Sequence, residues 1–362
     1  MAEGSTRRAA LAALGGLALA PRAGWAALGG ARFLSSARLA DQTHALIGLD
    51  GRGGEAFRLA LPGRGHAAAA HPFHPVAVAF ARRPGNFAMA LDCAAGAELA
   101  RLRAPEGRHF YGHGAFSADG GTLFTTENAY ESGEGRIGLW DAADGYRRIG
   151  EIPSGGIGPH DVRLAAGGGA LIVANGGLRT HPDTGRAKLN LPDMRPNLAW
   201  IGVEDGAILD IVEPPEALRF NSLRHLAAAG DLVAVGAQWQ GDMAAAPPLL
   251  AFHRRGGGLD WAKAGAREWA TMRGYVGSVA LSADARTVAA TSPRGGAVMT
   301  FDAASGRASG MFRAADVCGV APFGAGFATT TGQGVWARRG ESGEMAEEAR
   351  RGVEFDNHLI AL

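Results

Sequence analysis

The chain of 362 residues has little cysteine, almost no net charge and no long apolar run after its N-terminus. Two cysteines, Cys93 and Cys318, cannot form a disulfide framework, so stability must come from a large core. We expect both to be small buried apolar residues, and a single bridge between them is the alternative. With 36 Lys and Arg against 35 Asp and Glu, the net charge of +1 gives no reason to expect a nucleic-acid partner.

Several familiar functional motifs are also absent. The sequence contains no G-x-S-x-G, H-E-x-x-H or C-x-x-C-H motif and no Walker-type glycine loop. Their absence excludes the usual serine hydrolase, zinc protease, c-type haem and nucleotide-binding interpretations.

The N-terminus has the form of an export signal. Arg7 and Arg8 precede an apolar run over residues 9–20, which is too short to span a bilayer as a mature helix. This pattern predicts a twin-arginine signal over residues 1–30 and a periplasmic location. The Ala-rich residues 23–31 offer several cleavage points and no clean A-x-A site, so the cleavage site stays open and an uncleaved anchor is the alternative.

Glycine is the abundant residue, with 56 copies, or roughly twice the average of about 7%. The glycines follow no triplet period, which excludes collagen. Many short strands joined by tight turns would explain them, because turns with positive φ favour a residue without Cβ. The composition therefore predicts an all-β repeat protein.

One repeat unit recurs along the chain. Its clearest copies, residues 112–128 and 158–175, read as a strand, a glycine-rich turn and a second strand. A third strand ending in an acidic residue before a glycine turn follows, as at Trp140-Asp141. Seven first-strand positions are equivalent and lie 39 to 65 residues apart: His66, His113, His160, His225, Ser278, Gly319 and His358. Propeller blades have a period of roughly 40–50 residues.

The two ends of the chain complement each other. Residues 357–362 look like a first strand with nothing after it, and residues 33–61 supply later strands with no first strand. We therefore predict a seven-bladed β-propeller of four-stranded blades over residues 31–362, with its last blade closed by both termini. The Pro-rich residues 179–196 should form a surface loop.

Five of the seven equivalent positions are histidine, which is far more than random placement of 11 histidines would give. First strands lie beside the channel of a propeller, so His66, His113, His160, His225 and His358 should form an axial ring. Convergent imidazoles suit copper, iron or zinc. Polar residues near the same rim are candidates to support the imidazoles by hydrogen bonds: Asp161, Arg224, Glu127, Asn128, Asn175, Gln238 and Asn357.

A structural role for the histidines is the alternative. Gly112-His113, followed by Trp140-Asp141, resembles the Gly-His and Trp-Asp pairs of WD40 propellers, in which the histidine locks its own blade. In contrast, Pro159-His160-Asp161-Val162 resembles a turn of YVTN-type and streptogramin-lyase-like propellers, whose histidines face the cavity. Geometry must decide between the two roles.

The leader, the Gly-His-Gly strand, the Pro-His-Asp-Val turn, residues 221–225 and Asn357-His358 together resemble an exported bacterial propeller family, domain of unknown function 1513. The resemblance covers nearly the whole mature chain. Members tend to be encoded beside imelysin-like and other iron-associated periplasmic proteins, which implies such proteins as partners and a role in iron or metal acquisition. The family has no established activity, so no catalytic residue follows from the resemblance.

We expect a monomeric periplasmic protein, without a transmembrane domain in the mature chain, that binds a transition metal or a metal-containing small ligand through the axial histidines. Two alternatives stay open. One is a metal-assisted lyase or lactonase-like enzyme that uses imidazole as general base. The other is a protein-interaction scaffold with structural histidines.

Overall fold

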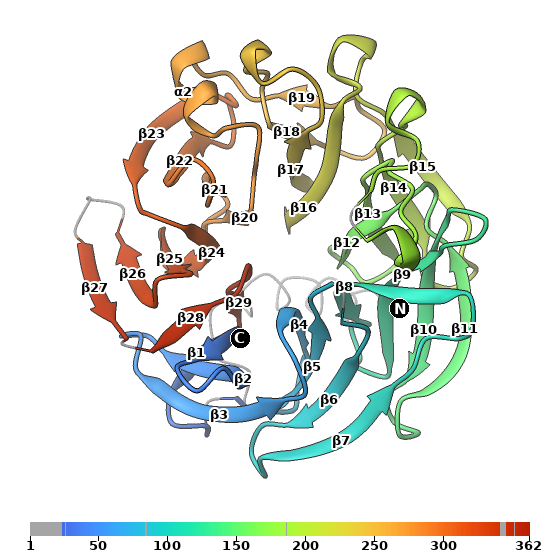
Figure 1. Ribbon diagram of the computed structural model, residues 1–362, viewed down its shortest axis with the longest axis vertical. Helices are drawn as coiled ribbons and strands as arrows, with labels where there is room; N and C mark the ends of the chain where they lie inside the picture. Colours follow the sequence, from blue (N-terminus) through green and yellow to red (C-terminus); the bar gives the residue numbers. More distant parts are fainter. Residues whose placement is uncertain (1–23, 26, 84, 186, 341–344, 351) are drawn as a thin grey trace, which may run out of the picture.

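The computed structural model describes residues 24–362 except 26, 84, 186, 341–344 and 351. It forms a ring of seven antiparallel sheets around a central axis (Figure 1), which confirms the predicted seven-bladed propeller. Most of the predicted export signal lies outside the described residues. No helix in the described part of the chain is long and apolar enough to cross a membrane.

Six blades each use four consecutive strands, ordered from the axis outward. The first two contain β4 (Gly65–Ala70), β5 (Val76–Ala81), β6 (Ala88–Asp92) and β7 (Ala97–Leu102), then β8 (Arg108–Phe116), β9 (Thr122–Ala129), β10 (Glu134–Asp141) and β11 (Arg147–Pro153). The next two contain β12 (Pro159–Leu164), β13 (Ala170–Asn175), β14 (Asn197–Gly202) and β15 (Ile208–Val212), then β16 (Asn221–Ala229), β17 (Leu232–Trp239), β18 (Leu250–His253) and β19 (Asp260–Trp261). The last two contain β20 (Ser278–Leu281), β21 (Thr287–Ser292), β22 (Ala297–Asp302) and β23 (Ala308–Arg313), then β24 (Val317–Phe323), β25 (Gly326–Thr331), β26 (Val335–Arg339) and β27 (Met345–Ala349). Short helical turns join some of them: η1 (Pro182–Thr184), η2 (Leu191–Asp193), η3 (Glu216–Leu218), η4 (Met243–Ala245) and α2 (Ala266–Thr271).

Both ends of the chain build the seventh blade, as predicted. It contains β1 (Ala31–Leu39), β2 (His44–Asp50) and β3 (Glu55–Leu61), with β28 (Val353–Phe355) and β29 (Ile360–Ala361) on the inner side of β1. Phe33 pairs with Ala361, while Ala37 pairs with Phe355. The C-terminal contribution is thus longer than the predicted residues 357–362, because β28 pairs as well. Pairing of β28 and β29 with β1 completes the seventh blade and closes the ring.

Apolar packing between blades holds the ring together. Seven buried clusters occur among the described residues, and each joins two neighbouring blades. In one of them Phe80 of β5 packs with Leu123 and Trp140 of the next blade. Such face-to-face packing of sheets supplies the large core that the low cysteine content requires.

The N-terminal segment before β1 is part of this core. Trp25 is fully buried in the cluster between the first two blades of the chain, and its indole N–H donates to the carbonyl of His71 over 3.1 Å. Trp25 lies within the residues that the sequence assigns to the export signal. Its burial favours a folded unit that begins before residue 31.

Both cysteines are free and buried, as expected from the sequence. Burial raises the pKa of the Cys93 and Cys318 thiols to about 12. Each thiol therefore stays protonated at neutral pH and packs as a small apolar group.

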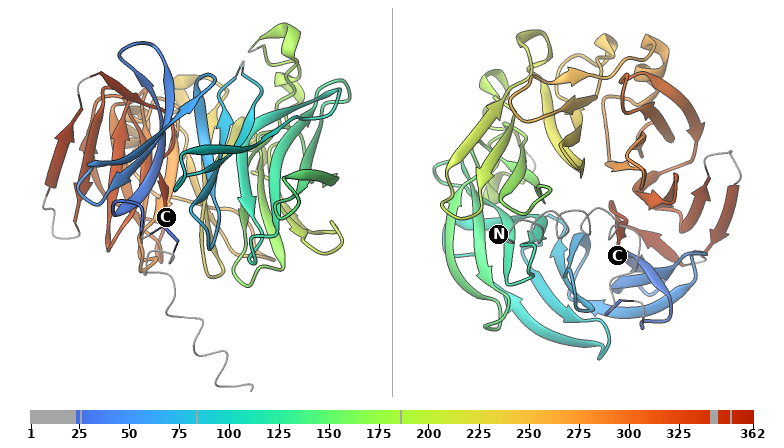
Figure 2. Two further views of the ribbon diagram at one scale, coloured as in Figure 1. Left: turned by 90° about the horizontal axis from the view of Figure 1, so that it is seen from below. Right: turned by 180° about the vertical axis from the view of Figure 1, so that it is seen from behind.

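The predicted surface loop, residues 179–196, contains η1 and η2 and joins β13 to β14. Figure 2 shows the ring from the side, with the longer connections projecting from its two faces. Leu178, Thr180 and Lys188 of this region line a cavity at one end of the channel, so the loop also forms part of a wall.

Candidate metal centre

The innermost strands carry the five histidines to the axis. Strands β4, β8, β12, β16, β20 and β24 and the segment that ends in β29 contact one another around the channel (Figure 1). His66, His113, His160 and His225 lie on four of these strands, and His358 lies between β28 and β29. The first four therefore lie on the inner strands that the repeat pattern predicted, and His358 lies in the short link between the two inner strands of the seventh blade.

Irregular pairing presents these residues to the channel. The registers of β4, β8 and β12 against the next strand shift at His66, His113 and His160. In β16 the extra residue is Arg224, directly before His225. A β-bulge redirects a side chain that regular pairing would send to a sheet face, and bulges are frequent next to functional sites.

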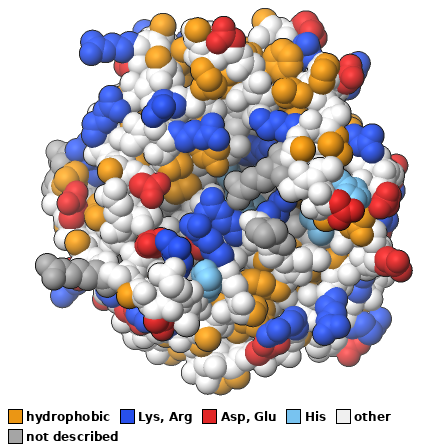
Figure 3. Space-filling model, viewed as in Figure 1, with side chains coloured by type: hydrophobic (Ala, Val, Ile, Leu, Met, Phe, Trp, Pro, Cys, Tyr) orange, Lys and Arg blue, Asp and Glu red, His pale blue; other side chains and the backbone are white. Residues whose placement is uncertain are grey.

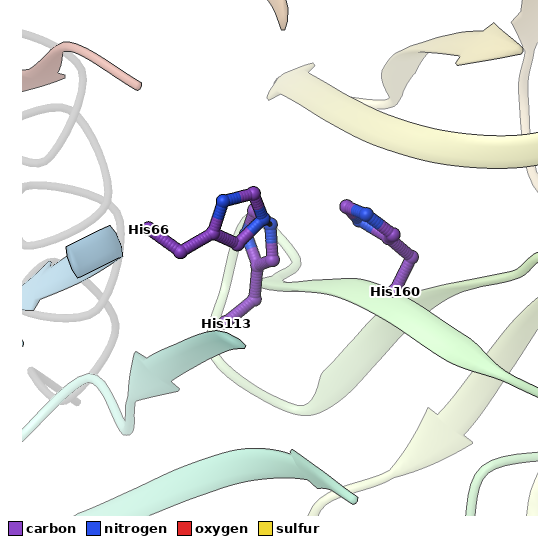
Figure 4. A group of neighbouring side chains, drawn as sticks. All are labelled: His66, His113 and His160. Atoms are coloured by element: carbon purple, nitrogen blue, oxygen red, sulfur yellow. Dashed lines mark hydrogen bonds between the residues drawn. The ribbon is translucent and has the colours of Figure 1, made fainter. Parts of the chain in front are cut away.

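The imidazoles converge closely. The Nε2 atoms of His66 and His113 are 3.2 Å apart. His113 also lies near His358, with ring centroids 4.7 Å apart, and His160 near His225, at 4.8 Å. Figure 4 shows the rings of His66, His113 and His160 pointing toward one another.

Two groups of three could each hold one ion, and they share His113. In the first group, His66, His113 and His160 each offer one ring nitrogen, and these three nitrogens lie within 4.8 Å of one another. The same holds for His113, His225 and His358 in the second group. Two nitrogens bound to one tetrahedral ion at 2.0–2.1 Å lie about 3.3 Å apart. The separation of 3.2 Å between His66 and His113 already matches this value.

A buried carboxylate orients His113. Asp161 Oδ1 lies 3.2 Å from His113 Nδ1, and Asp161 also accepts the backbone N–H groups of Val162 and Leu226. Burial opposes ionisation of Asp161, but Arg163 and His113 outweigh it and hold the pKa of the carboxyl well below its usual value. The carboxylate favours the proton on Nδ1, so that Nε2, which lies beside Nε2 of His66, carries the lone pair, as in carboxylate–histidine–metal arrangements.

Other ring nitrogens in the cluster are buried and have no hydrogen-bond partner. These are Nδ1 of His66, His160 and His225 and Nε2 of His358. The second nitrogen of His358, Nδ1, lies 3.3 Å from the hydroxyl of Ser278. An unsatisfied buried polar atom costs about 1–3 kcal/mol, and a bound ion would remove part of this cost.

Four of the five imidazoles have pKa values lowered by their surroundings. Burial, followed by repulsion from the other rings and nearby arginines, lowers the pKa of His66, His160 and His358 well below the ordinary value. The same causes lower the pKa of His225 to about 3, although Asp161 partly opposes them. Neutral imidazole is the form that binds metal ions.

The first glycine of the Gly-His-Gly motif, Gly112, is required by its backbone conformation and by the close approach of His66. Its φ of 101° is unfavourable for residues with a side chain, and a Cβ would lie 2.6 Å from Cδ2 of His66. The neighbouring blade therefore places an imidazole where only glycine leaves room. Gly114 makes room for Phe80 in a similar way.

The blade-locking role known from WD40 proteins predicts that each imidazole bonds within its own blade. The partners of His113 are instead His66 and Asp161, in the two neighbouring blades, and His358 contacts Ser278 of another blade. This geometry favours the channel-facing role.

The structure places three of the predicted supporting residues elsewhere. Glu127 is bound by Arg148 over 2.7 Å, and the side-chain amide of Asn128 donates to the carbonyl of Thr180. Asn175 belongs to a separate buried polar network. All three lie on second strands, one strand away from the axis, and their hydrogen bonds go to groups other than the imidazoles, while Asn128 Oδ1 has no partner. These hydrogen bonds do not reach the imidazoles.

Asp161 contacts the cluster, and Arg224, Gln238 and Asn357 line a cavity of about 310 Å³ together with His66, His160 and His225. Sequence reasoning missed Arg82, Arg83, Lys188 and Arg294, as well as Trp239 and Tyr275, which line the same cavity. A signal was available, because Arg82 directly follows β5 and Arg294 closely follows β21, at equivalent ends of second strands.

Fold and site together define a seven-bladed β-propeller with a histidine cluster on its axis. The chain belongs to the family described as protein of unknown function (DUF1513), whose model matches residues 59–362, and this confirms the resemblance seen in the sequence. No curated protein matches the chain. Among solved structures it is similar to hydrazine synthase of Kuenenia stuttgartiensis, with a TM-score of 0.61 and 12% identity over 90% of this chain and 97% of that chain. At this identity the likeness shows the fold alone.

Proposed function

We propose that the protein is an exported propeller that holds one transition-metal ion, copper, iron or zinc, free or within a small metal-containing ligand, at the axial cluster. The observation that carries the proposal is the convergence of five imidazoles from five blades, with an available nitrogen on each ring of two groups. Nitrogen donors of intermediate softness suit these metals. The predicted twin-arginine leader would place the site in the periplasm, where a role in metal acquisition beside iron-associated proteins would be exercised.

The group of His66, His113 and His160 is the better primary site. His66 and His160 line the cavity, so an ion bound there would be open to a ligand entering from the channel mouth. Three protein ligands and one open position are typical of functional zinc sites, whereas closed four-ligand sites are structural. In the second group only His225 lines the cavity.

The first test is metal analysis of the protein purified after export in its native host, because cytoplasmic overexpression can load the wrong ion. The demetallated protein is then titrated calorimetrically with Cu(II), Zn(II) and Fe(II) at pH 7.5 and 5.5. We expect one ion per chain, bound tightly at pH 7.5 and still tightly at pH 5.5, because burial lowers the pKa of His66 and His160 and keeps these ring nitrogens free of protons.

Histidine variants identify the ligands. The double variant His160→Gln/His225→Gln removes one ligand from each group and should abolish tight binding, while circular dichroism stays that of a β protein. His44→Gln/His74→Gln, which removes two imidazoles that do not line the cavity, is the matched control. Equal affinities in the wild type and the first double variant would refute the metal site.

Single variants separate the two groups. His66→Gln affects only the group that faces the cavity, and a companion variant, His358→Gln, affects only the other. We expect the larger loss of affinity with His66→Gln.

A further inference from the structure

The cavity above the histidine cluster is strongly cationic. Among the described residues that line it, five are Lys or Arg and none is Asp or Glu: Arg82, Arg83, Lys188, Arg224 and Arg294. Figure 3 shows Lys and Arg side chains gathered around the hollow at the centre of this face. These residues come from separate blades and from the long β13–β14 connection, so the fold and not one local run of sequence brings them together.

Arg224 is the cavity cation that most clearly lacks a negatively charged partner. It is the extra residue of the bulge in β16 and is partly buried, and its Nε has no hydrogen-bond partner. No described Asp or Glu lines the cavity with it. A buried cation without a counter-charge is costly, and a bound anion would offset that cost.

Lys188 and Arg294 line the same cavity and are more exposed than Arg224. Partial burial, then repulsion from Arg224 and Arg294, lowers the pKa of the Lys188 ammonium. Arg294 lies over the ring of Tyr275, 4.4 Å from its centroid, which holds the guanidinium at the cavity wall. Arg82 differs, because it already forms an ion pair with Asp356 over 3.3 Å.

We propose that this cavity binds a small molecule with at least two oxyanion groups, carboxylates or phosphates, through Arg224, Arg294 and Lys188. Planar guanidinium groups bind both kinds of oxyanion through paired hydrogen bonds. The volume of about 310 Å³ is suited to a small molecule. Tyr111, Trp239 and Tyr275 form the aromatic part of the wall. The site goes beyond the proposed metal centre and does not require it, since all three cations belong to the protein.

The test uses the metal-free full chain and two probes, citrate and pyrophosphate, in calorimetric titrations at low ionic strength. We expect saturable binding of one probe molecule per chain that weakens as salt is added. Arg224→Gln and Arg294→Gln should each weaken binding by about tenfold or more, because hydrogen bonds between charged groups are the strong ones. Arg255→Gln removes an exposed cation that does not line the cavity and should leave the affinity unchanged.

The probes also identify the chemistry. Binding of citrate alone indicates a carboxylate ligand, and binding of pyrophosphate alone indicates a phosphate ligand. If Arg224→Gln does not fold, Arg294→Gln and Lys188→Gln at the more open part of the cavity carry the test. Absence of saturable binding of either probe, or equal affinities in the wild type and the cavity variants, overturns the proposal. Failure of the metal centre would leave these results untouched, since no metal is present.

Discussion

The pH dependence of stability tests whether the imidazoles are buried together and neutral. His66, His160, His225 and His358 all have pKa values lowered in the fold, chiefly by burial. In the unfolded chain each returns to about 6.5. Below this pH the unfolded state therefore binds more protons than the folded state, and the free energy of unfolding must fall as the pH falls.

The magnitude follows from linkage. Between pH 7.5 and 5.5 each histidine that stays neutral in the fold lowers the free energy of unfolding by about 1.4 kcal/mol. Four such residues give about 5 kcal/mol, which is a large part of the roughly 5–15 kcal/mol that stabilises a typical domain. The loss begins near pH 6.5 and continues toward the folded pKa, which for His225 is about 3.

Urea unfolding of the demetallated protein at both pH values measures this loss. The variant His160→Gln/His225→Gln keeps two of the four groups, so its loss should be smaller by about 2.7 kcal/mol. Groups other than these histidines titrate in both proteins and cancel in the comparison. Equal losses in the two proteins would refute the claim that these imidazoles are buried and neutral.

Three further changes test the surroundings of the cluster and the start of the folded unit. Gly112→Ala should destabilise the protein by about 1–3 kcal/mol, seen as a lower melting temperature, because its φ is positive and the new Cβ would collide with His66. Asp161→Asn should weaken metal binding about 10- to 100-fold in calorimetry, because it loses the carboxylate that orients His113. Trp25→Ala should cost about 3–5 kcal/mol in urea unfolding, and mass spectrometry of the exported protein should find an N-terminus before Trp25, since this side chain is fully buried. Unchanged melting, metal affinity or unfolding, respectively, would contradict each expectation.

The repeat pattern predicted the blades because each blade needs similar residues at equivalent positions of its strands and turns. Trp140-Asp141 ends the third strand of its blade, and His66 and His225 occupy equivalent inner strands, as the spacing indicated. Periodicity identifies strands and turns but does not report hydrogen-bond partners. For Glu127 the decisive fact is the position of Arg148 two strands along, which pairing register and not spacing determines.

The cationic cavity was harder to predict for a related reason. Net charge averages over the chain, so a value of +1 conceals a local group of cations. Lys188 and Arg294 are more than one hundred positions apart in sequence and come together only when the ring closes. Arg224 is redirected by a bulge, and a sequence pattern of alternating strand faces does not anticipate an extra residue.

The cations of the cavity have two opposing effects on metal binding by the histidines. Arg224 lowers the pKa of His160 and His225, which keeps these imidazoles in the neutral form that binds metal. The same positive charge repels a metal cation that approaches through the cavity. A bound oxyanion would resolve the conflict, because it neutralises the guanidinium groups and can occupy the open position of an ion held by His66 and His160. Linkage then requires that an oxyanion increase the affinity for metal by the same factor as the metal increases the affinity for the oxyanion.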